Sequence, residues 1–344
     1  MSKIGYVSIP ALNQYLATAN SLGLQYAPLL ERLNLNAEVL ADHHHRVPAS
    51  TLEHLLDNLI PASKDELFGL HTAAFIQPAS YSVLGYIAMN CATLKEALQH
   101  VPIYEKIVGD MGVTATEEHA GEMLIRWTCQ LSRARVREHV TANVLASWVS
   151  FARWLTQSES SPNKVCFQFS APDDPALLQE YQAVFQCDIV FDQAYNGLWI
   201  AKENLDLTIE QADPQVLHSL LEHATQVLHR VHEGESIGAQ VRSLLKLLFT
   251  DKFPNRDTIA EKLGMTTRTL QRKLKQEGTG FQQLLDETRK ELALYYLGHT
   301  EMTIENIAEK TGFGETRSFY RRFKEWTGET AGNYRNKHLQ NSLS

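Results

Sequence analysis

Two stretches of this sequence place arginine, glutamine and lysine at helical spacing around a pair of apolar residues. They cover residues 258–275 and 304–324. In each stretch the apolar pair lies four residues apart, so it forms a buried stripe and leaves the polar side chains on an exposed face. Arginine and glutamine carry donors that match the edges of guanine and adenine in a major groove. The pattern therefore predicts sequence-specific contact with DNA.

The two exposed faces hold similar kinds of residue. Arginine, glutamine, threonine and tyrosine are placed to reach base edges, whereas the lysines and one further arginine are expected to contact phosphate, which fixes position without reading sequence. The predicted base-reading residues are Thr267, Arg268, Gln271 and Arg272 in the first stretch and Thr316, Arg317, Tyr320 and Arg321 in the second, and the predicted phosphate contacts are Lys273, Lys275, Lys310, Arg322 and Lys324.

Each face needs a preceding helix and a tight turn to hold it. Both copies read Ile-Ala-Glu-Lys-x-Gly followed by an apolar residue, either Met265 or Phe313. Gly264 and Gly312 can adopt the left-handed backbone that ends the first helix, and the apolar residue then fills the wedge between the helices. An ordinary amphipathic hairpin with a solvated basic face is the alternative, but the repeat favours two helix-turn-helix units. The buried stripes are Leu270 with Leu274 and Phe319 with Phe323.

A predicted helix from about Gln282 to Leu297 connects the two units. Its 16 residues span about 24 Å at 1.5 Å per residue. Two recognition helices that enter successive major grooves must lie about 34 Å apart. We therefore expect one protomer to read two successive grooves on one face of a duplex.

The carboxy-terminal region resembles the DNA-binding domain of AraC/XylS-family transcription regulators over roughly its last hundred residues. Matched residue by residue, the positions where the two recognition helices of that family meet bases are Arg268, Gln271 and Arg272 in the first helix and Thr316, Arg317, Tyr320 and Arg321 in the second. Two positions depart from the family pattern, because Thr311 replaces the usual leucine and Ala331 the usual proline. The resemblance is carried by Leu270-Gln-Arg-Lys-Leu-Lys, Glu277-Gly-Thr-Gly-Phe281, the stripe of Arg289, Ala293 and Leu297, Ile307-Ala308, Gly312-Phe313, Phe323-Lys-Glu-Trp-Thr-Gly328 and Tyr334-Arg335.

Charge separates the two ends of the chain. The 344 residues carry a formal net charge of -8, yet residues 242–338 contain 18 Lys and Arg against 13 Asp and Glu. The remainder contains 14 against 27. An acidic body with a basic end is the asymmetry expected when one domain contacts phosphate. A chain of this length also predicts two or three domains.

The amino-terminal part mixes helical and strand periodicities. A period of two predicts a hairpin over residues 112–130, and residues 42–48 are expected to form a loop. The predicted fold class is mainly α, with an α+β amino-terminal domain and an all-α carboxy-terminal domain of two helix-turn-helix units joined by a long helix. Helices are predicted within 10–35, 49–60, 66–76, 82–90, 93–109, 134–157 and 174–185, and short strands at 165–169, 189–191 and 198–201.

Residues 10–205 resemble the effector domain of the AraC-type branch that includes the ornithine-utilisation regulators. The resemblance implies a similar fold and an effector-sensing role for this domain. Its motifs are Arg46-Val-Pro, Phe68-Gly-Leu, Leu84-Gly-Tyr, Ala92-Thr-Leu-Lys-Glu-Ala-Leu98, Tyr104, Phe185-Gln-Cys-Asp and Phe191.

A helix that begins at Asp213-Pro214 carries an apolar stripe wide enough to face both its own domain and a partner subunit. A purely intramolecular helix is the equally weighted alternative. Residues Glu233 to Gly238 are expected to form a hinge. The predicted domains are 1–210 for effector sensing, 211–238 for dimerisation and linkage, and 239–338 for DNA binding, and the predicted dimerisation residues are Leu217, Leu220, Leu221, Ala224 and Leu228.

Motifs for catalysis or metal binding are missing from the sequence. The four cysteines lie 21 to 38 residues apart without a Cys-x-x-Cys pair, and His43, His44 and His45 are adjacent residues of a predicted loop. No nucleotide-binding glycine loop, Gly-x-Ser-x-Gly or His-Glu-x-x-His occurs. We therefore predict no enzyme activity, no metal and no cofactor.

The prediction is a cytoplasmic, sequence-specific transcriptional regulator, since neither a secretion signal nor a long apolar run is present. Its expected partners are double-stranded DNA, a small-molecule effector, a second copy of the chain and RNA polymerase. The alternative is a constitutive or architectural DNA-binding protein whose amino-terminal domain serves only dimerisation.

Overall fold

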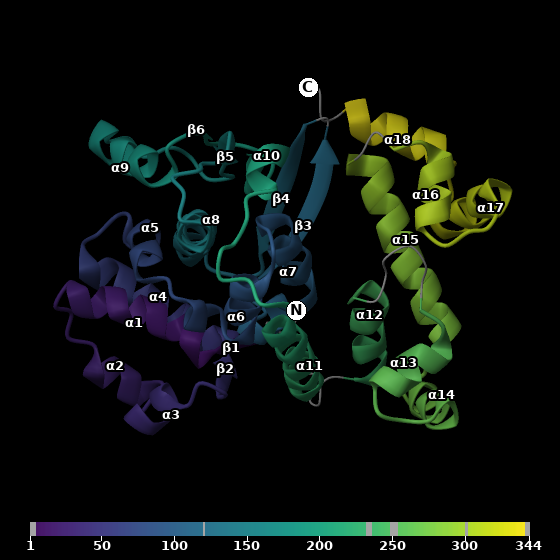
Figure 1. The fold of residues 1–344 in the computed structure, drawn as a ribbon, viewed down its shortest axis with the longest axis horizontal. Helices are drawn as coiled ribbons and strands as arrows, with labels where there is room; N and C mark the ends of the chain where they lie inside the picture. The colour runs from purple at the N-terminus through teal and green to yellow at the C-terminus, as the bar shows by residue number, and fades with distance from the viewer. Residues whose placement is uncertain (1–4, 120, 232–235, 248–253, 300–301, 341–344) are drawn as a thin grey trace. The chain divides into compact units, whose positions relative to one another are not determined.

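The chain divides into two units that differ in their secondary structure. The units are Met1–Leu228, which mixes helices with a sheet, and His229–Ser344, whose described elements are all helices. They run from purple to green and from green to yellow in Figure 1. The predicted fold class is confirmed. The computed structural model describes residues 5–119, 121–231, 236–247, 254–299 and 302–340.

Short polar side chains begin several helices of the first unit. The Ser8 hydroxyl accepts a hydrogen bond from the Ala11 N–H (3.4 Å), and Asp174 Oδ1 accepts one from the Ala176 N–H (2.8 Å). Such caps satisfy backbone donors that have no partner inside the helix. The helices are α1 Ile9–Ser21, α2 Ala27–Arg32, α3 Ala37–Ala41, α4 Ala49–Ser63, α5 Phe68–Thr72, α6 Val83–Asn90, α7 Leu94–Val108, α8 Ala134–Thr156, α9 Pro175–Phe185, α10 Lys202–Leu205 and α11 Pro214–Val231, with 3-10 turns at Ala73–Phe75 and Pro78–Tyr81.

The main sheet of this unit has five strands in the order β3-β4-β7-β5-β6. Strands β5 and β6 are parallel, and the other neighbours are antiparallel. The predicted hairpin over 112–130 is confirmed as the pair β3 and β4. The strands are β3 Gly112–His119, β4 Glu122–Cys129, β5 Lys164–Cys166, β6 Asp188–Val190 and β7 Gly197–Ala201.

A second, two-stranded sheet overturns one prediction. Residues 42–48 were expected to form a loop, but Arg46–Pro48 is strand β2, antiparallel to β1, Tyr6–Ser8. Val7 and Val47 face each other in this pair, and both are buried. A local sequence pattern does not reveal this short strand, because its partner lies about forty residues earlier in the chain.

Helix α8 packs in the core of the first unit against α4, α5 and α9. Gln14 Nε2, from α1, lies 3.1–3.2 Å from Thr72 O, Asn143 Oδ1 and Ser147 Oγ. Asn143 Nδ2 also donates to the Tyr15 hydroxyl (2.8 Å). Buried polar groups need such partners, so the network aligns α1 and α5 on α8.

Two glycines explain motifs that carry the resemblance to effector domains. A Cβ atom on Gly69 would lie 2.0 Å from the backbone oxygen of His139, and one on Gly85 would lie 2.0 Å from that of Pro78. Phe68-Gly-Leu and Leu84-Gly-Tyr therefore mark places where a helix approaches another backbone too closely for any side chain.

The second unit consists of two cores on one long helix. Leu284 and Leu285, near the start of α15, belong to the first core, and Ala293 and Leu297, near its end, belong to the second. The connecting helix predicted over 282–297 is confirmed. The helices are α12 Ile237–Leu247, α13 Arg256–Lys262, α14 Thr267–Gln276, α15 Phe281–His299, α16 Ile304–Lys310, α17 Thr316–Thr327 and α18 Ala331–Gln340.

The predicted hinge falls partly outside the described residues, which omit 232–235. Its end is wrong, because Gly238 lies in the first turn of α12. Glu277 accepts hydrogen bonds there from the N–H groups of Ile237 (2.6 Å) and Gly238 (2.8 Å). The carboxylate of Glu277 thus accepts backbone N–H groups that have no partner inside α12. The glycine in the sequence gives no sign of this distant partner. No described helix is long and apolar enough to cross a membrane.

Candidate nucleic-acid interface

Helices α13 and α14 form the first helix-turn-helix unit. Asn255 begins α13 by accepting the Thr258 N–H (2.8 Å), and Thr266 begins α14 by accepting the Thr269 N–H (3.2 Å). Between the helices, Gly264 has φ +63°, as predicted. The left-handed backbone lets the chain reverse within residues 263–266.

The buried stripe of α14 settles which side of the helix faces out. Leu270 and Leu274 are fully buried, and Met265 packs against the same core. The opposite side exposes Arg268, Gln271, Arg272 and Lys275, whereas Lys273 and Thr267 are half-buried. The hydroxyl of Thr267 donates to Asp257 Oδ1 (2.7 Å), which links α14 to α13. The unit thus presents a row of exposed donors on a helix with a rigid base.

Helices α16 and α17 repeat this arrangement with one more residue in the turn, residues 311–315. Thr303 caps α16 through the Asn306 N–H (3.2 Å), and Gly312 has φ +76°. Thr311, where the family has leucine, is fully buried, and its hydroxyl donates to the Ile307 carbonyl (2.6 Å). The departure from the family pattern therefore leaves no polar group without a partner.

The core beneath α17 is aromatic. Phe319 and Phe323 are fully buried, as predicted, and the Phe313 ring lies edge-on to that of Phe319, with ring centres 5.6 Å apart. Trp326 also packs edge-on against Phe313, at 5.9 Å. The exposed side carries Arg317, Tyr320, Arg321 and Lys324, and Thr316 is half-buried.

Helix α15 supports the second unit through its own cations. Arg289 donates to the carbonyl of Gly312 (3.2 Å) and lies over the ring of Phe313, 5.3 Å from its centre. Burial lowers the pKa of Arg289. Lys290 donates to the carbonyl of Trp326 (2.9 Å). Arg289 thus holds the turn of the second unit on α15, and Lys290 holds the end of α17 on the same helix.

Arg322 has different partners from those that we predicted. Its guanidinium forms ion pairs with Asp286 on α15 and with Glu325 (2.9 Å). Hydrogen bonds to Glu325 and Asp286 raise its pKa. A phosphate contact would have to replace these carboxylates, so the structure gives Arg322 a role in holding α17 on α15. Lys310 and Lys324 are exposed.

Helix α11 divides the predicted dimerisation residues into two groups. Leu217, Ala224 and Leu228 are buried within the single chain. Leu220 and Leu221 are half-buried. The first group has little surface left for a partner to bury, because its side chains already lack solvent exposure.

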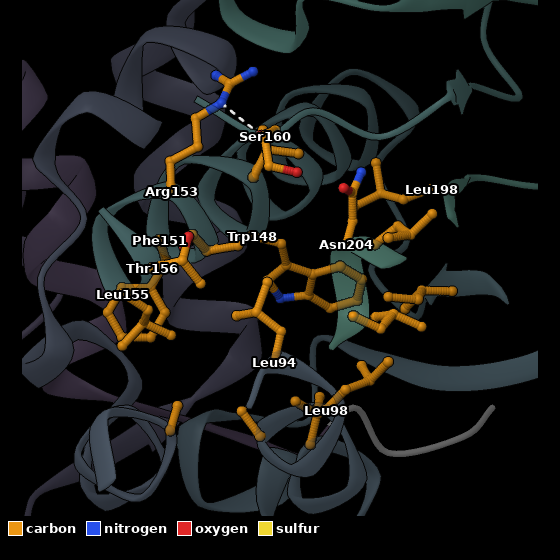
Figure 2. A pocket seen from close by; sticks show the side chains of 18 of the residues that line it. Leu94, Leu98, Trp148, Phe151, Arg153, Leu155, Thr156, Ser160, Leu198 and Asn204 are labelled. Carbon is orange, nitrogen blue, oxygen red and sulfur yellow. Dashed lines mark hydrogen bonds between the residues drawn. The ribbon is translucent and has the colours of Figure 1, made fainter. Parts of the chain in front are cut away.

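The first unit also contains a cavity that the sequence analysis did not identify. It has a volume of about 150 Å³ and lies among α6, α7, α8, α10, β4 and β7. Figure 2 shows the Trp148 ring in its middle, with Leu94 and Leu98 on one side and Asn204 on another. Helix periodicity along one element does not reveal the space that the packing of these side chains leaves.

A separate polar hollow of about 370 Å³ lies where α8 meets the sheet. Arg137 and Glu138 from α8 and Gln168 and Asn196 from the sheet side line it. His139, the neighbour of Glu138, is not part of it. Its Nδ1 accepts the Gly69 N–H (3.2 Å), and burial lowers its pKa to about 4. His139 is thus a neutral packing residue.

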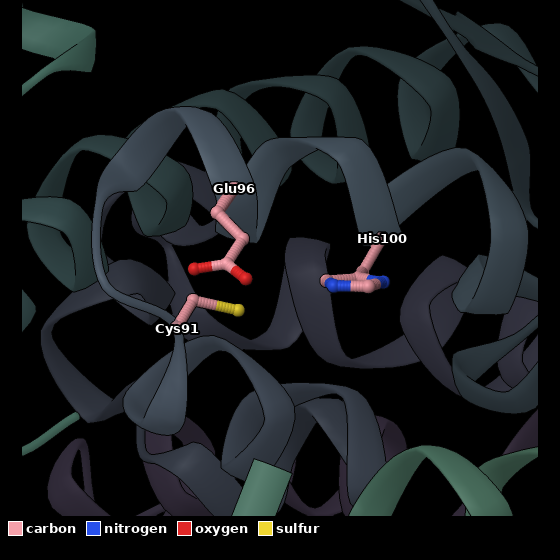
Figure 3. Close-up of side chains that lie close together, drawn as sticks. All are labelled: Cys91, Glu96 and His100. Carbon is pink, nitrogen blue, oxygen red and sulfur yellow. The ribbon is translucent and has the colours of Figure 1, made fainter. Parts of the chain in front are cut away.

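A cluster of Cys91, Glu96 and His100 brings three potential metal ligands within 4.8 Å of one another, as Figure 3 shows. The Cys91 thiol lies 3.3 Å from the Ile87 carbonyl, to which it donates, and Glu96 accepts the Ala92 N–H (2.6 Å). Burial raises the pKa of Cys91 to about 12, which disfavours the thiolate that a metal needs. These hydrogen bonds account for the positions of Cys91 and Glu96, and we assign no metal to the cluster.

Two helix-turn-helix units with exposed basic faces define the chain as a DNA-binding transcription regulator. Residues 23–209 match the family described as the arabinose-binding domain of AraC transcription regulators, and residues 259–337 match the family described as a helix-turn-helix domain. The chain belongs to the AraC family.

Known relatives cover most of the chain. It is 25% identical over 313 residues to the ornithine utilization regulator of Pseudomonas aeruginosa, covering 91% of each protein. It is 25% identical over 287 residues to the regulator VqsM of the same organism, covering 78% of this chain and 83% of VqsM. The crystal structure of the regulator CdpR from Pseudomonas aeruginosa aligns with a TM-score of 0.47 and 22% identity, over 95% of this chain and 96% of CdpR.

Proposed function

We propose that this regulator binds DNA as a dimer, reads bases mainly with its first helix-turn-helix unit, and responds to a small molecule bound by its amino-terminal unit. The observation that carries the proposal is the row of exposed donors on α14, formed by Arg268, Gln271 and Arg272 above the fully buried Leu270 and Leu274. Arginine and glutamine in such a row offer the paired donors that guanine and adenine accept.

The two units share the work on DNA unequally in this proposal. In α17, Tyr320 takes the place of Gln271, and the exposed Arg317 and Arg321 flank it. Base contacts by Thr267 and Thr316 complete the two faces. Lys273, Lys275, Lys310 and Lys324 contact phosphate, which adds affinity that salt screens and no preference among sequences. RNA polymerase is the expected protein partner at the bound operator.

The dimer contact is proposed on the exposed side of α11. Val216 is 43% exposed, and Leu220 lies four residues on along the same side of the helix. Apolar side chains exposed on that side do not stabilise a monomer, whereas contact with a second copy would bury them.

Removing residues 1–235 tests the dimer proposal. The remaining fragment keeps both helix-turn-helix cores, so it should bind one site with unchanged base preference. On an operator with two sites it should bind more weakly than the full chain, because two linked protomers add their contacts. Equal binding by the fragment and the full chain would support the architectural alternative.

Charged substitutions on α11 test the same contact in the full chain. Val216→Glu and Leu220→Glu should shift sedimentation toward the monomer without lowering the melting temperature. Gln226→Glu, an exposed polar position on the same helix, is the matched control. Leu228 is unsuitable, because it is only 5% exposed and a charge there would disturb its own unit.

A further inference from the structure

The cavity among α6, α7 and α8 has an almost entirely apolar lining. The large apolar side chains of its lining include Leu94, Leu98, Trp148, Phe151, Ile200 and Leu205. The cavity volume of about 150 Å³ matches a space known to hold a ring or chain of about six carbon atoms. Such a space favours a small ligand that fills it by apolar contact.

Arg153 and Asn204 at the cavity are already engaged, whereas the buried hydroxyl of Tyr81, another lining residue, has no hydrogen-bond partner among the described residues. Arg153 donates to the carbonyls of Ser160 (3.1 Å), Val184 (2.7 Å) and Phe185 (3.1 Å), and to the Ser161 hydroxyl (2.7 Å). Figure 2 shows its guanidinium beside Ser160, away from Trp148. Asn204 Nδ2 donates to the Ser161 carbonyl (3.0 Å), which leaves its side-chain oxygen as an acceptor at the rim.

The lining also lacks the groups that a charged or sugar ligand needs. Among the described residues that line the cavity, none is Asp, Glu, Lys or His. An ammonium group would enter without a carboxylate to pair with, and a carboxylate would find only a guanidinium whose donors face backbone oxygens. A sugar would bury several hydroxyls against Leu, Ile and Trp without hydrogen bonds.

We propose that this cavity binds a small, uncharged and largely apolar effector, a ring or short alkyl chain that carries at most one hydroxyl, which would bond the side-chain oxygen of Asn204 or the unpartnered hydroxyl of Tyr81. The inference rests on the effector response in the proposed function and adds the chemical class of the ligand. It separates this chain from a sugar sensor and from a sensor of amino acids with charged side chains.

Helix α7 connects the cavity to the helix proposed for dimerisation. Leu94, Leu98 and Val101 of α7 line the cavity. Farther along the same helix, the buried Tyr104 places its hydroxyl 3.4 Å from that of Thr225 on α11. A ligand that shifts or stiffens α7 therefore changes the support of α11, which gives it a route to the dimer contact.

The first experiment compares melting temperatures of the full-length protein with four compounds at equal concentration: 1-hexanol, hexanoate, L-arabinose and L-ornithine. Because a ligand selective for the folded state stabilises it by mass action, 1-hexanol should raise the melting temperature progressively with concentration. Hexanoate should act more weakly, and arabinose and ornithine should have no effect. A rise with arabinose or ornithine and none with 1-hexanol would overturn the proposal.

Substitutions at Leu98 place the effect at the cavity. Leu98→Phe should fill the cavity, so at least ten times more 1-hexanol should be needed for the same rise in melting temperature. Leu98→Ala should enlarge the cavity and shift the preference toward longer alcohols. Gln99→Ala, an exposed neighbour on the same helix, should respond like the unmodified protein. If Leu98→Phe fails to fold, the chain-length shift of Leu98→Ala still decides the site. Unchanged responses in both variants would refute it.

A DNA titration separates the ligand class from the proposed function. If 1-hexanol binds and changes operator affinity by roughly 5- to 150-fold, both the ligand class of the cavity and the effector response are supported. If it binds at Leu98 but leaves operator affinity unchanged, the cavity assignment stands and the effector response fails. If a polar metabolite changes operator affinity and Arg137→Ala in the polar hollow abolishes that change, the response stands and the apolar cavity is the wrong site.

Discussion

The two helix-turn-helix units have nearly the same sequence in their first helices but differ in their second helices. Their first helices, α13 and α16, both have seven residues and end at a left-handed glycine. Their second helices differ at the start, where Thr266 caps α14 but Glu315 provides no side-chain cap for α17. They also differ beneath, since leucines support α14 and phenylalanines support α17.

The two units also differ in how they use their charged side chains. In α14, Arg268, Arg272 and Lys275 are exposed, whereas Arg322 of α17 is held by Asp286 and Glu325. The second unit is further secured by Arg289 and Lys290 of α15. Each recognition helix still exposes three cations, but only α14 adds a glutamine, Gln271, at the position where α17 has Tyr320. We therefore expect the first unit to discriminate among sequences and the second to position the protein.

The largest expected effect comes from removing the aromatic core of the second unit. Phe319→Ala should cost about 3–5 kcal/mol, since a fully buried ring is replaced by a cavity. Because the two cores are separate, hydrogen exchange should accelerate in α16 and α17 while α13 and α14 stay protected. Leu270→Ala is the matched variant and should reverse the pattern. Equal acceleration in both units would show that they unfold together.

Next in size is the effect of Arg272→Ala on DNA binding. Loss of a base contact should cost about 1–3 kcal/mol and relax preference at one or two base pairs. Arg317→Ala in the second unit should weaken binding more evenly across sequences. Binding measured against a randomised operator library checks both variants. A larger change of preference with Arg317→Ala would reverse the assigned roles.

A smaller effect is expected when Arg322 is released. Asp286→Asn should cost at most about 1 kcal/mol of stability, because the ion pair is partly exposed. When Glu325→Gln also removes the second carboxylate, the guanidinium should reach phosphate, raise affinity several-fold and steepen the salt dependence by about one charge. Glu261→Gln, at an exposed carboxylate on α13, removes the same charge and is the control. Unchanged salt dependence would mean that Arg322 stays on α15.

The smallest effect should come from giving α17 the cap that α14 has. Glu315→Thr should stabilise the second unit by about 0.5–1 kcal/mol if the hydroxyl accepts a backbone N–H, and it removes a negative charge from the DNA side. Affinity should rise slightly and evenly across sequences. Thermal unfolding and titration of two unrelated duplexes measure this, and a change in preference would instead place Glu315 at a base.

The sequence by itself determined the two helix-turn-helix units. Gly264 and Gly312, the apolar pairs four residues apart and the exposed arginines all act within about twenty residues, where helix periodicity and turn chemistry are sufficient. The hairpin over 112–130 and the long helix α15 were predictable for the same reason. Local preference and tertiary packing agree at these places, so the pattern indicates the structure.

Tertiary structure alone decided the features that depend on distant partners. Asp286 binds Arg322 from 36 positions away, and Glu277 caps a helix that begins 40 residues earlier. The division of α11 into buried and exposed residues depends on what packs beneath it. The cavity exists because side chains from six elements meet without filling the space among them, and no periodicity along one element measures that space.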